Sequence, residues 1–346
     1  MAELSVAIYA SGYVPQMIER SVKSAVSQSL DSMEIILIDD CRTSAESRYV
    51  KSTFKKIKKS LSLPYGKGLR FLSMGRSVGI PDSLRAAVDE SSGRYFTVLM
   101  MGDVFYDEKS LSALLELSSR NASIAGEDWD LVQGTVVPDE KDESVLKVNP
   151  NAYDIIERNA PGELRFENPD DFTVDYFMGE KFSLCLEGKL FIRSALEDMF
   201  LRMPRVECHI AVEYLWMYFF CRQSRTLIST GEKVCTKYMD FGPDAGDFKI
   251  ETPGRWMKLC SAASAFSAVF FDMMDYPLES RDFGGYMRSI MTRYALSNVK
   301  SLVRVDPSIR TVCEAILSEC WGDEIVSDCK AWIESSDGKK TDGPET

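Results

Sequence analysis

The segment from Leu4 to Asp40 reads LSVAIYASGYVPQMIERSVKSAVSQSLDSMEIILIDD, and its pattern decides the fold class. Its opening run, LSVAIYA, is apolar and long enough for a buried strand. Residues 13–28 place apolar side chains at the spacing of one helix face, and residues 34–38, EIILI, form a second apolar run. A strand, an amphipathic helix and a second strand, joined by short connections, predict a parallel βαβ unit.

The same alternation of apolar runs and amphipathic stretches continues along the chain as far as about Ala125. Strands alternating with helices predict a parallel sheet with helices on both faces. We therefore expect an α/β protein with a Rossmann-like, mostly parallel sheet. The further elements expected are strands over Arg70–Ser73, Tyr95–Met100 and Asp130–Val137, and helices over Ser47–Leu61, Ser83–Glu90 and Lys109–Ser119.

The rest of the chain has a different pattern. Residues 138–171 are polar with weak periodicity, which is typical of a functional loop or lid. Residues 335–346, SSDGKKTDGPET, contain no apolar side chain and are expected to be disordered. Between these two stretches helices are expected over Ser194–Leu201, Val212–Arg222, Trp256–Met274, Tyr286–Val305, Ser308–Cys320 and Glu324–Glu334, so that the chain ends in an α-helical extension.

The composition is that of an ordinary globular protein with one or two domains, because 45% of the 346 residues are hydrophobic and 27% are charged. A net charge of -12 argues against binding of nucleic acid, which needs a basic surface. His209 is the single histidine, so His-rich metal sites are excluded and a Ser-His-Asp triad is a poor hypothesis.

The cysteines and the N-terminus indicate the compartment. The nine cysteines form no CxxC pair and mostly lie in apolar runs, which favours free thiols in a reducing cytosol. The opening residues, MAELSVAIYA, lack the basic region and long apolar stretch of a signal peptide. No apolar run reaches the roughly 18–20 residues of a membrane span. We therefore expect a cytoplasmic protein.

Acidic side chains follow two of the expected strands, Asp39 and Asp40 after the second and Asp103 after the fourth. Ligands bind beyond the carboxyl ends of the strands in open parallel sheets. Carboxylates at this edge can accept hydrogen bonds from a base or ribose, or hold a divalent cation against a diphosphate. A turn or helix-cap role is the alternative for each aspartate alone. The presence of two such sites in register favours a ligand site.

Five segments follow one another in a recognisable order and spacing: Ser5–Tyr9 with Ser24–Gln28, Glu34–Asp40, Gly93–Phe96 with Met101–Asp103, Leu186–Arg193 and Val212–Trp216. Together they cover roughly Leu4 to Tyr238 and resemble the inverting family 2 glycosyltransferases of the GT-A fold. The first two resemble the family's opening strand with its helix and its strand that ends in two aspartates. The third resembles its strand followed by D-x-D, and the last two resemble its GKLF-R segment and its ED-x-x-F helix start.

The resemblance implies a nucleotide-sugar donor site. It places Asp40 at the nucleotide base, with Asp39 supporting the loop beside it. Arg85, in the segment that corresponds to the family's A-R-N, is expected to reach a donor phosphate. Tyr9 and Ser11 are further candidates for donor contacts. The family's nucleobase tyrosine is absent after the first strand, and Tyr9 or Tyr13 is the candidate to substitute for it.

The resemblance also assigns a metal site and a base. Asp103 matches the last aspartate of D-x-D, which holds Mg²⁺ or Mn²⁺ on the donor diphosphate. With Trp216 aligned to the family's aromatic residue, Glu213 falls at the carboxylate that deprotonates the acceptor hydroxyl for inversion. Without the resemblance, Glu213 reads equally well as a helix-start carboxylate beside the helix dipole.

The chain departs from the family at two places. Residues 10–13 read ASGY where the family has P-x-Y-N, so the tyrosine and the asparagine are missing. Met101 replaces the first aspartate of D-x-D, and Val104 stands where an acidic residue is frequent. These losses leave open an alternative, a catalytically impaired GT-A-fold binding or assembly module.

The expected function is transfer of a sugar, with inversion, from a nucleoside-diphosphate donor to a hydroxyl of a glycan or lipid-linked acceptor in cell-envelope polysaccharide synthesis. Residues 1–125 would bind the donor and 126–240 the acceptor, followed by a helical region over 241–334 and the tail. The lysines within Lys51–Lys59 form a solvated helix face or dock peripherally on the inner membrane face. The C-terminal helices form a homodimer interface or cover the acceptor site.

Overall fold

The computed structural model describes residues 2–12, 14–61, 66–120, 128–140, 152–238 and 249–338. The chain packs into two compact units. The first, called the α/β unit, comprises Met1–Val206 and Trp216–Phe241. The second, called the helical unit, comprises Glu207–Leu215 and Gly242–Thr346. The predicted donor half, 1–125, lies in the α/β unit, and so does the predicted acceptor half, 126–240, except for residues 207–215. Their assignment to donor and acceptor stays a prediction.

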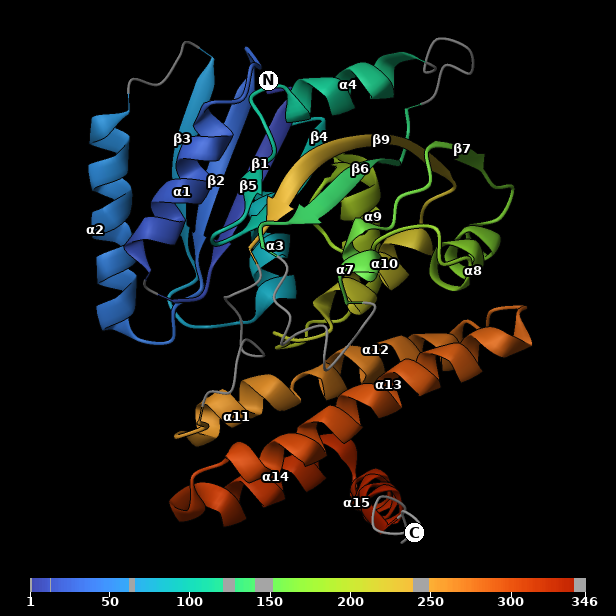
Figure 1. Cartoon of the computed structure of the whole chain (residues 1–346). Coiled ribbons are helices and arrows are strands. Elements are labelled where there is room, and N and C mark those ends of the chain that lie inside the picture. Colours follow the sequence, from blue (N-terminus) through green and yellow to red (C-terminus); the bar gives the residue numbers. More distant parts are fainter. Residues whose placement is uncertain are drawn as a thin grey trace, which may run out of the picture. The chain divides into compact units, whose positions relative to one another are not determined.

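One sheet runs through the α/β unit (Figure 1). Its parallel part has the order β3-β2-β1-β4. These strands are β1 (Leu4–Ala10), β2 (Met33–Asp39), β3 (Lys67–Ser73) and β4 (Tyr95–Met100). The predicted Rossmann-like α/β fold is therefore confirmed, and two of the predicted strands, β1 and β4, have the predicted bounds.

Shorter strands of mixed direction extend the sheet beyond β4. The order continues β8-β6-β9-β5, and β7 also pairs with β9. β6 and β9 are parallel, whereas the other new pairs are antiparallel. The bounds are β5 (Val104–Phe105), β6 (Leu131–Pro138), β7 (Gly162–Arg165), β8 (Lys189–Ile192) and β9 (Thr226–Lys237).

Helices cover both faces of the parallel part, as predicted. One side of β1, formed by Leu4, Val6 and Ile8, shares a core with α1, α2 and α4. The side chains of α3 do not belong to this core, and α3 packs on β1 and β2 together with α9. The helices of this unit are α1 (Pro15–Val26), α2 (Ser44–Ser60), α3 (Ile80–Asp89), α4 (Ser110–Arg120), α7 (Ala152–Glu157), α8 (Pro169–Met178) and α9 (Arg193–Arg202), and α10 (Val212–Cys221) begins in the helical unit.

The predicted loop over residues 138–171 is wrong in its described part, which contains α7, β7 and the start of α8. These elements are short, and β7 depends on its pairing with the distant strand β9. Such a contact leaves no periodic pattern in the local sequence. Residues 141–151 of the predicted loop lie outside the described residues.

The helical unit contains α11 (Pro253–Cys260), α12 (Ala262–Asp275), α13 (Arg281–Ser301), α14 (Arg310–Trp321) and α15 (Asp323–Gly338). The helix predicted over Trp256–Met274 is two helices, α11 and α12, which meet at Ser261. The Ser261 hydroxyl donates to the Lys258 carbonyl at 2.7 Å. Two buried indoles tie the helices together. Trp256 Nε1 donates to the Cys313 carbonyl at 2.7 Å, and Trp321 Nε1 donates to Asn298 at 2.9 Å.

Two predictions concern the ends and the membrane. The first four residues of the predicted disordered tail are helical, since α15 continues to Gly338, and residues 339–346 lie outside the described residues. In the described ranges, Pro253–Asp275 is the one helical stretch that is long and apolar enough to span a bilayer. Its most apolar window is 56% buried.

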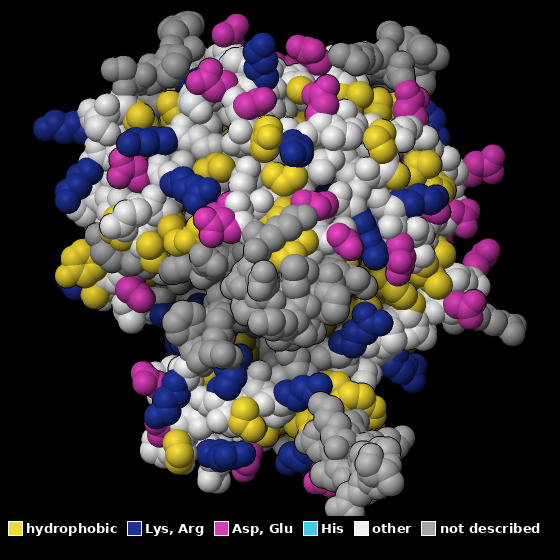
Figure 2. All heavy atoms as spheres, in the orientation of Figure 1, with side chains coloured by type: hydrophobic (Ala, Val, Ile, Leu, Met, Phe, Trp, Pro, Cys, Tyr) yellow, Lys and Arg dark blue, Asp and Glu magenta, His cyan; other side chains and the backbone are white. Residues whose placement is uncertain are grey.

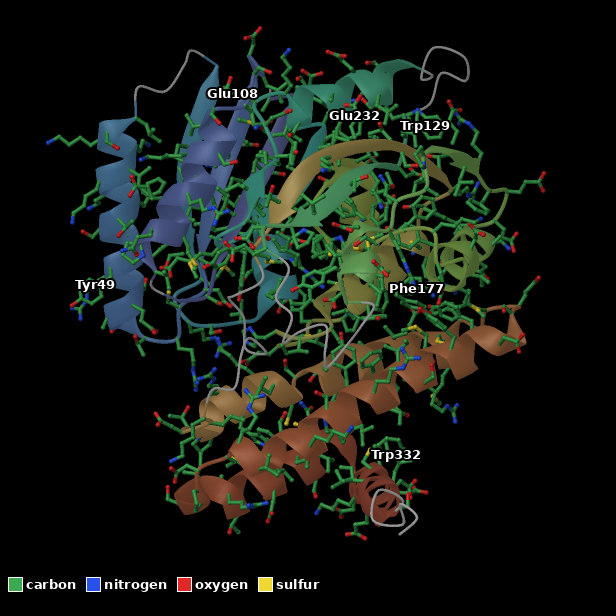
Figure 3. All side chains as sticks on the ribbon, in the orientation of Figure 1. Tyr49, Glu108, Trp129, Phe177, Glu232 and Trp332 are labelled. Carbon is green, nitrogen blue, oxygen red and sulfur yellow. The ribbon has the colours of Figure 1, made fainter. Side chains whose placement is uncertain are left out.

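The outer face of α2 is basic. Figure 2 shows Lys and Arg side chains over this helix, and Tyr49 points outward among them in Figure 3. The basic residues that are exposed on α2 are Arg48, Lys51, Lys55, Lys56, Lys58 and Lys59. Val50, Phe54 and Ile57 form the opposite, buried face. The predicted basic helix face is confirmed, and what it binds is not decided by this arrangement.

The amino ends of β1, β2 and β4 are joined by a buried carboxylate. Glu34 accepts hydrogen bonds from the hydroxyls of Ser5 at 2.7 Å and Ser92 at 3.0 Å, and Arg70 lies 3.4 Å away. Burial would raise the pKa of Glu34, but these donors outweigh it and lower the pKa. Gly93, the residue after Ser92, packs against β1. A Cβ atom at this position would lie 2.5 Å from the Ser5 backbone nitrogen.

This contact predicts that Gly93→Ala destabilises the chain by about 2–3 kcal/mol, because the added methyl group meets backbone that cannot move without breaking the β1–β4 pairing. Urea unfolding measures the loss. Gly68→Ala, in β3, is the matched control, since its Cβ atom would make only an ordinary contact at 3.9 Å. Equal stability of the two variants would contradict the prediction.

Candidate active site

The carboxyl ends of β1, β2 and β4 lie side by side, as the sequence predicts. In the sheet register Tyr9 is opposite Ile38 on β2 and Met100 on β4. The loops that follow β2 and β4 are both hydrogen-bonded to the end of β1. The Asp40 N–H donates to the Ala10 carbonyl at 2.9 Å, and the Met101 N–H donates to the Tyr9 carbonyl at 3.0 Å.

Asp40 is fully buried and holds the loop that leads into α3. The Val78 N–H donates to its Oδ1 at 2.6 Å, and the Gly79 N–H donates to its Oδ2 at 3.2 Å. The Tyr9 hydroxyl donates to the same Oδ2 at 2.7 Å, and Ser11 hydrogen-bonds Tyr9 in turn. Burial, and then the charge of Asp40, raises the pKa of Tyr9, which keeps this hydroxyl protonated. The structure thus brings Tyr9, Ser11 and Asp40 together.

Asp39 serves a neighbouring junction. It accepts hydrogen bonds from the Ser73 hydroxyl at 3.2 Å, from the Cys41 N–H at 3.3 Å and from the Ser47 hydroxyl. Ser73 ends β3 and Ser47 lies in the first turns of α2. Asp39 therefore ties the end of β3 to the start of α2, while Asp40 ties β2 to the loop before α3.

The turn after β4 is fixed by Ser21, a buried residue of α1. The Gly102 N–H donates to the Ser21 hydroxyl at 2.9 Å, and that hydroxyl donates to the Asp103 carbonyl at 2.8 Å. Gly102 has φ +105°, a conformation that residues with a side chain rarely adopt. The turn directs the Asp103 side chain inward, where it is 2% exposed and accepts from the Tyr238 N–H at 2.7 Å.

Asp103 belongs to a buried group of three charges with Glu187 and Lys237. Lys237 Nζ lies 2.6 Å from Glu187 Oε1 and 3.8 Å from Asp103 Oδ2. The Asp103 and Glu187 carboxyl groups also hydrogen-bond each other. The antiparallel pairing of Val104 with Thr236 brings the end of β9 to the turn after β4, which explains why these distant residues meet.

The pKa directions in this group follow from burial and from the shared ammonium. Burial and the nearby Glu187 charge raise the pKa of Asp103. Burial would also raise the pKa of Glu187, but Lys237 outweighs it and lowers the pKa. Burial opposes the charge of Lys237, yet the two carboxyl groups raise its pKa well above the ordinary value. At neutral pH Lys237 and Glu187 are therefore an ion pair, with Asp103 beside it.

A divalent cation does not fit this group as it stands. An Asp103 carboxylate would attract a cation, but the Lys237 ammonium already lies 3.8 Å from its Oδ2 and would repel one. Glu187, the other nearby carboxylate, is paired with the same ammonium. Within the described ranges, no group of three or more His, Cys, Asp and Glu side chains converges as metal ligands would.

Arg85 lies elsewhere in the α/β unit, between α3 and the end of α9. Its guanidinium donates to the Met203 carbonyl at 2.7 Å and to the Pro204 carbonyl at 3.3 Å. It also lies 4.9 Å from the centre of the Phe200 ring and 3.7 Å from Asp82. The structure does not bring Arg85 to Asp40 or Asp103 by any of these contacts, and its role at a phosphate stays a prediction.

Glu213 belongs to the helical unit, in the first turn of α10. It is half-buried, and the Tyr294 hydroxyl donates to its Oε1 at 3.4 Å. Ala211, two residues earlier, has φ +62°, a strained value for a residue with a side chain. A carboxylate at a helix N-terminus is stabilised by the helix dipole. The role of Glu213 as a base stays a prediction.

Sequence reasoning missed two of the three buried charges. Glu187 lies within the quoted segment Leu186–Arg193, so an acid directly before GKLF was a usable signal. Lys237 had none, because β9 was not predicted. Lys189, in the same quoted segment, is a fully buried lysine that donates to the carbonyls of Ser183, at 2.9 Å, and Cys185.

Comparison with known proteins gives one family. The sequence matches the family model of Glycosyl transferase family 2 over residues 5–200, more than half of the chain. No curated protein matches it in sequence.

Two solved structures share the fold. S. aureus TarS 1–349 in complex with UDP-GlcNAc has a TM-score of 0.51 and 10% identity over 95% of this chain and 92% of that one. The mannosyltransferase PcManGT from Pyrobaculum calidifontis, in complex with GDP-Man and Mn²⁺, has a TM-score of 0.52 and 12% identity over 97% and 79%. At these identities the likeness shows the fold alone.

Burial lowers the pKa of Lys189 from 10.5 to about 8. The unfolded chain therefore binds more protons than the folded chain between these two values, and stability rises with pH across that window. We predict that the stability of the wild type relative to Lys189→Met rises by about 2 kcal/mol from about pH 7.5 to about pH 9.5 in urea unfolding. Lys233→Met, at an exposed lysine of β9, is the control. A pH-independent difference for Lys189→Met would contradict the prediction.

Proposed function

Because the chain belongs to glycosyl transferase family 2, we propose that it transfers a sugar from a nucleoside-diphosphate donor to a hydroxyl group of an acceptor. The observation that carries the proposal is the family match over residues 5–200, together with the GT-A arrangement of β1, β2 and β4. The two structural neighbours are complexes with UDP-GlcNAc and GDP-Man, which supports a nucleotide sugar as the donor class.

The donor nucleoside is proposed to bind at the carboxyl ends of β1 and β2. Tyr9, Ser11 and Asp40 meet there, and Asp40 holds the backbone of Val78 and Gly79 at the start of α3. A nucleoside bound against the loop before α3 would be positioned by that loop. Asp40 fixes the conformation of the loop and so acts on the nucleoside through it. Asp39 and Arg85 are kept as further donor-site candidates from the family resemblance.

The acceptor step is proposed to use Glu213 as general base. A carboxylate in the first turn of α10 can take the proton of an acceptor hydroxyl, which then attacks the anomeric carbon from the side opposite the diphosphate. This geometry gives inversion at the anomeric carbon. The acceptor is proposed to be a glycan or a lipid-linked glycan, as in polysaccharide synthesis for the cell envelope.

The family resemblance also implies Mg²⁺ or Mn²⁺ at Asp103, and the mannosyltransferase structure contains Mn²⁺. The charges around Asp103 in this chain oppose a divalent cation. The proposed reaction therefore assigns no step to a metal ion.

The setting is proposed to be the cytoplasm, with peripheral contact on the inner membrane face. The exposed basic face of α2 supports this, because lysines near an anionic leaflet are attracted to it even in a chain of net charge -12. A homodimer through the C-terminal helices stays a further proposal. The helical unit exposes large apolar side chains, among them Phe271, Met274 and Trp332. Trp332 is labelled in Figure 3. Such side chains favour a face that a second copy of the chain would cover.

A second candidate function is a binding or assembly module that no longer transfers sugar. The observations that favour it are Met101 in place of an aspartate and the burial of Asp103. Thermal-shift measurements with a panel of nucleotide sugars, combined with an assay for release of nucleoside diphosphate, distinguish the two functions. Binding with turnover supports the transferase, binding without turnover supports the module, and no binding contradicts both.

We predict that Glu213→Gln lowers the turnover rate by roughly a hundredfold or more and leaves the affinity for the nucleotide unchanged, because the amide cannot accept the acceptor proton. The rate of nucleoside-diphosphate release with acceptor and the thermal shift with nucleotide measure the two quantities. Glu324→Gln, at an exposed carboxylate in the first turn of α15, is the matched control. Full turnover by Glu213→Gln would exclude Glu213 as the base.

A further inference from the structure

The proposed transfer needs a positive charge beside the donor diphosphate. The leaving nucleoside diphosphate gains negative charge as the glycosidic bond breaks, and a fixed cation stabilises that charge in the transition state. The inference below rests on the proposed function, since it concerns which group of this chain supplies the cation. The family resemblance places this cation at Asp103.

The position beside Asp103 is taken by a side chain. Lys237 Nζ lies 3.8 Å from Asp103 Oδ2 and 2.6 Å from Glu187 Oε1, at the end of β9. Its side chain is 25% exposed, whereas those of Asp103 and Glu187 are each 2% exposed. Lys237 is thus the least buried side chain of the three.

The charges of the group are balanced by the Lys237 ammonium and disfavour an added divalent cation. A pair of buried carboxylates with no counter-charge would attract a divalent ion strongly, but here the ammonium pairs with Glu187 and lies beside Asp103. The family's first D-x-D aspartate is Met101 in this chain, which removes one further negative charge at the same turn. Fewer carboxylates and a resident lysine both lower the affinity for Mg²⁺ or Mn²⁺.

A second cation lies close to the same strand end. The Arg20 guanidinium of α1 is 5.2 Å from the centre of the Tyr238 ring, and it is 3.7 Å from Asp139. The Asp139 N–H donates to the Lys237 carbonyl at 2.9 Å. Arg20 therefore lies close to the end of β9, paired with Asp139.

We propose that Lys237 takes the place of the divalent cation at Asp103, so that its ammonium is the positive partner of the donor diphosphate and the chain binds its donor without a metal ion. Asp103 and Glu187 then position the ammonium and do not coordinate a metal. Arg20 adds a second positive charge at the same edge of the sheet.

Electron paramagnetic resonance of Mn²⁺ added to the full chain, without nucleotide, tests the exchange of metal for lysine. The wild type is expected to bind no Mn²⁺ at Asp103. Lys237→Ala leaves Asp103 and Glu187 without their counter-charge, so it is expected to gain a Mn²⁺ site. Its affinity for Mn²⁺ should be at least about tenfold above any weak binding by the wild type. Lys237→Arg keeps the charge and should behave like the wild type, as should Lys233→Ala at an exposed lysine of the same strand.

A saturable Mn²⁺ site in the wild type that disappears in Asp103→Asn would overturn the proposal. So would equal Mn²⁺ binding by wild type and a folded Lys237→Ala. If Lys237→Ala does not fold, the wild-type titration decides alone.

A second arm uses UDP and GDP as probes, with the thermal shift of the wild type measured in excess EDTA and in Mn²⁺. Equal shifts support binding of the nucleotide without a metal ion, and a shift that needs Mn²⁺ overturns the proposal. Absence of binding in both conditions contradicts the proposed function and the phosphate role. The Mn²⁺ titration, which needs no nucleotide, still decides whether Lys237 excludes the metal.

Discussion

The parallel pairing of β1 with both β2 and β4 sets the positions of Tyr9, Asp40 and the turn before Asp103. β1 is buried along its whole length, and its neighbours end at the same level in the sheet. Asp40 and the turn at Met101–Asp103 start from backbone hydrogen bonds to Ala10 and Tyr9. The loops that follow β2 and β4 are thereby held next to each other, and their side chains face a common edge. Glu34 and Gly93 secure the opposite ends of the same strands.

The second governing constraint is that buried charge must be paired. Glu187 is too deeply buried to remain ionised without a cation, and Lys237 supplies one, while burial raises the pKa of the neighbouring Asp103. The turn after β4 directs Asp103 toward this ion pair. A metal-dependent site and a lysine-paired site satisfy the same carboxylates, and the group on β9 decides between them.

The sequence predicts those parts of the fold that leave a local pattern. β1 and β4 are continuous apolar runs, and α1, α2 and α3 have one apolar face each, so their positions follow from periodicity. β5, β7 and β9 depend on pairings between distant segments, and β9 mixes apolar with polar residues. The candidate site divides in the same way. Asp40 and Asp103 follow recognisable strands, whereas Lys237 reaches Asp103 only through the pairing of β5 with β9, and the contacts of Arg85 depend on where α9 ends.

If Lys237 is the positive partner of the donor diphosphate, as proposed, sugar transfer proceeds without a metal ion. The most direct measurement is the rate of nucleoside-diphosphate release from a bound nucleotide sugar in excess EDTA, with acceptor present. We expect release to continue at the rate seen with Mn²⁺. Release that stops in EDTA and returns on addition of Mn²⁺ would contradict the role of Lys237.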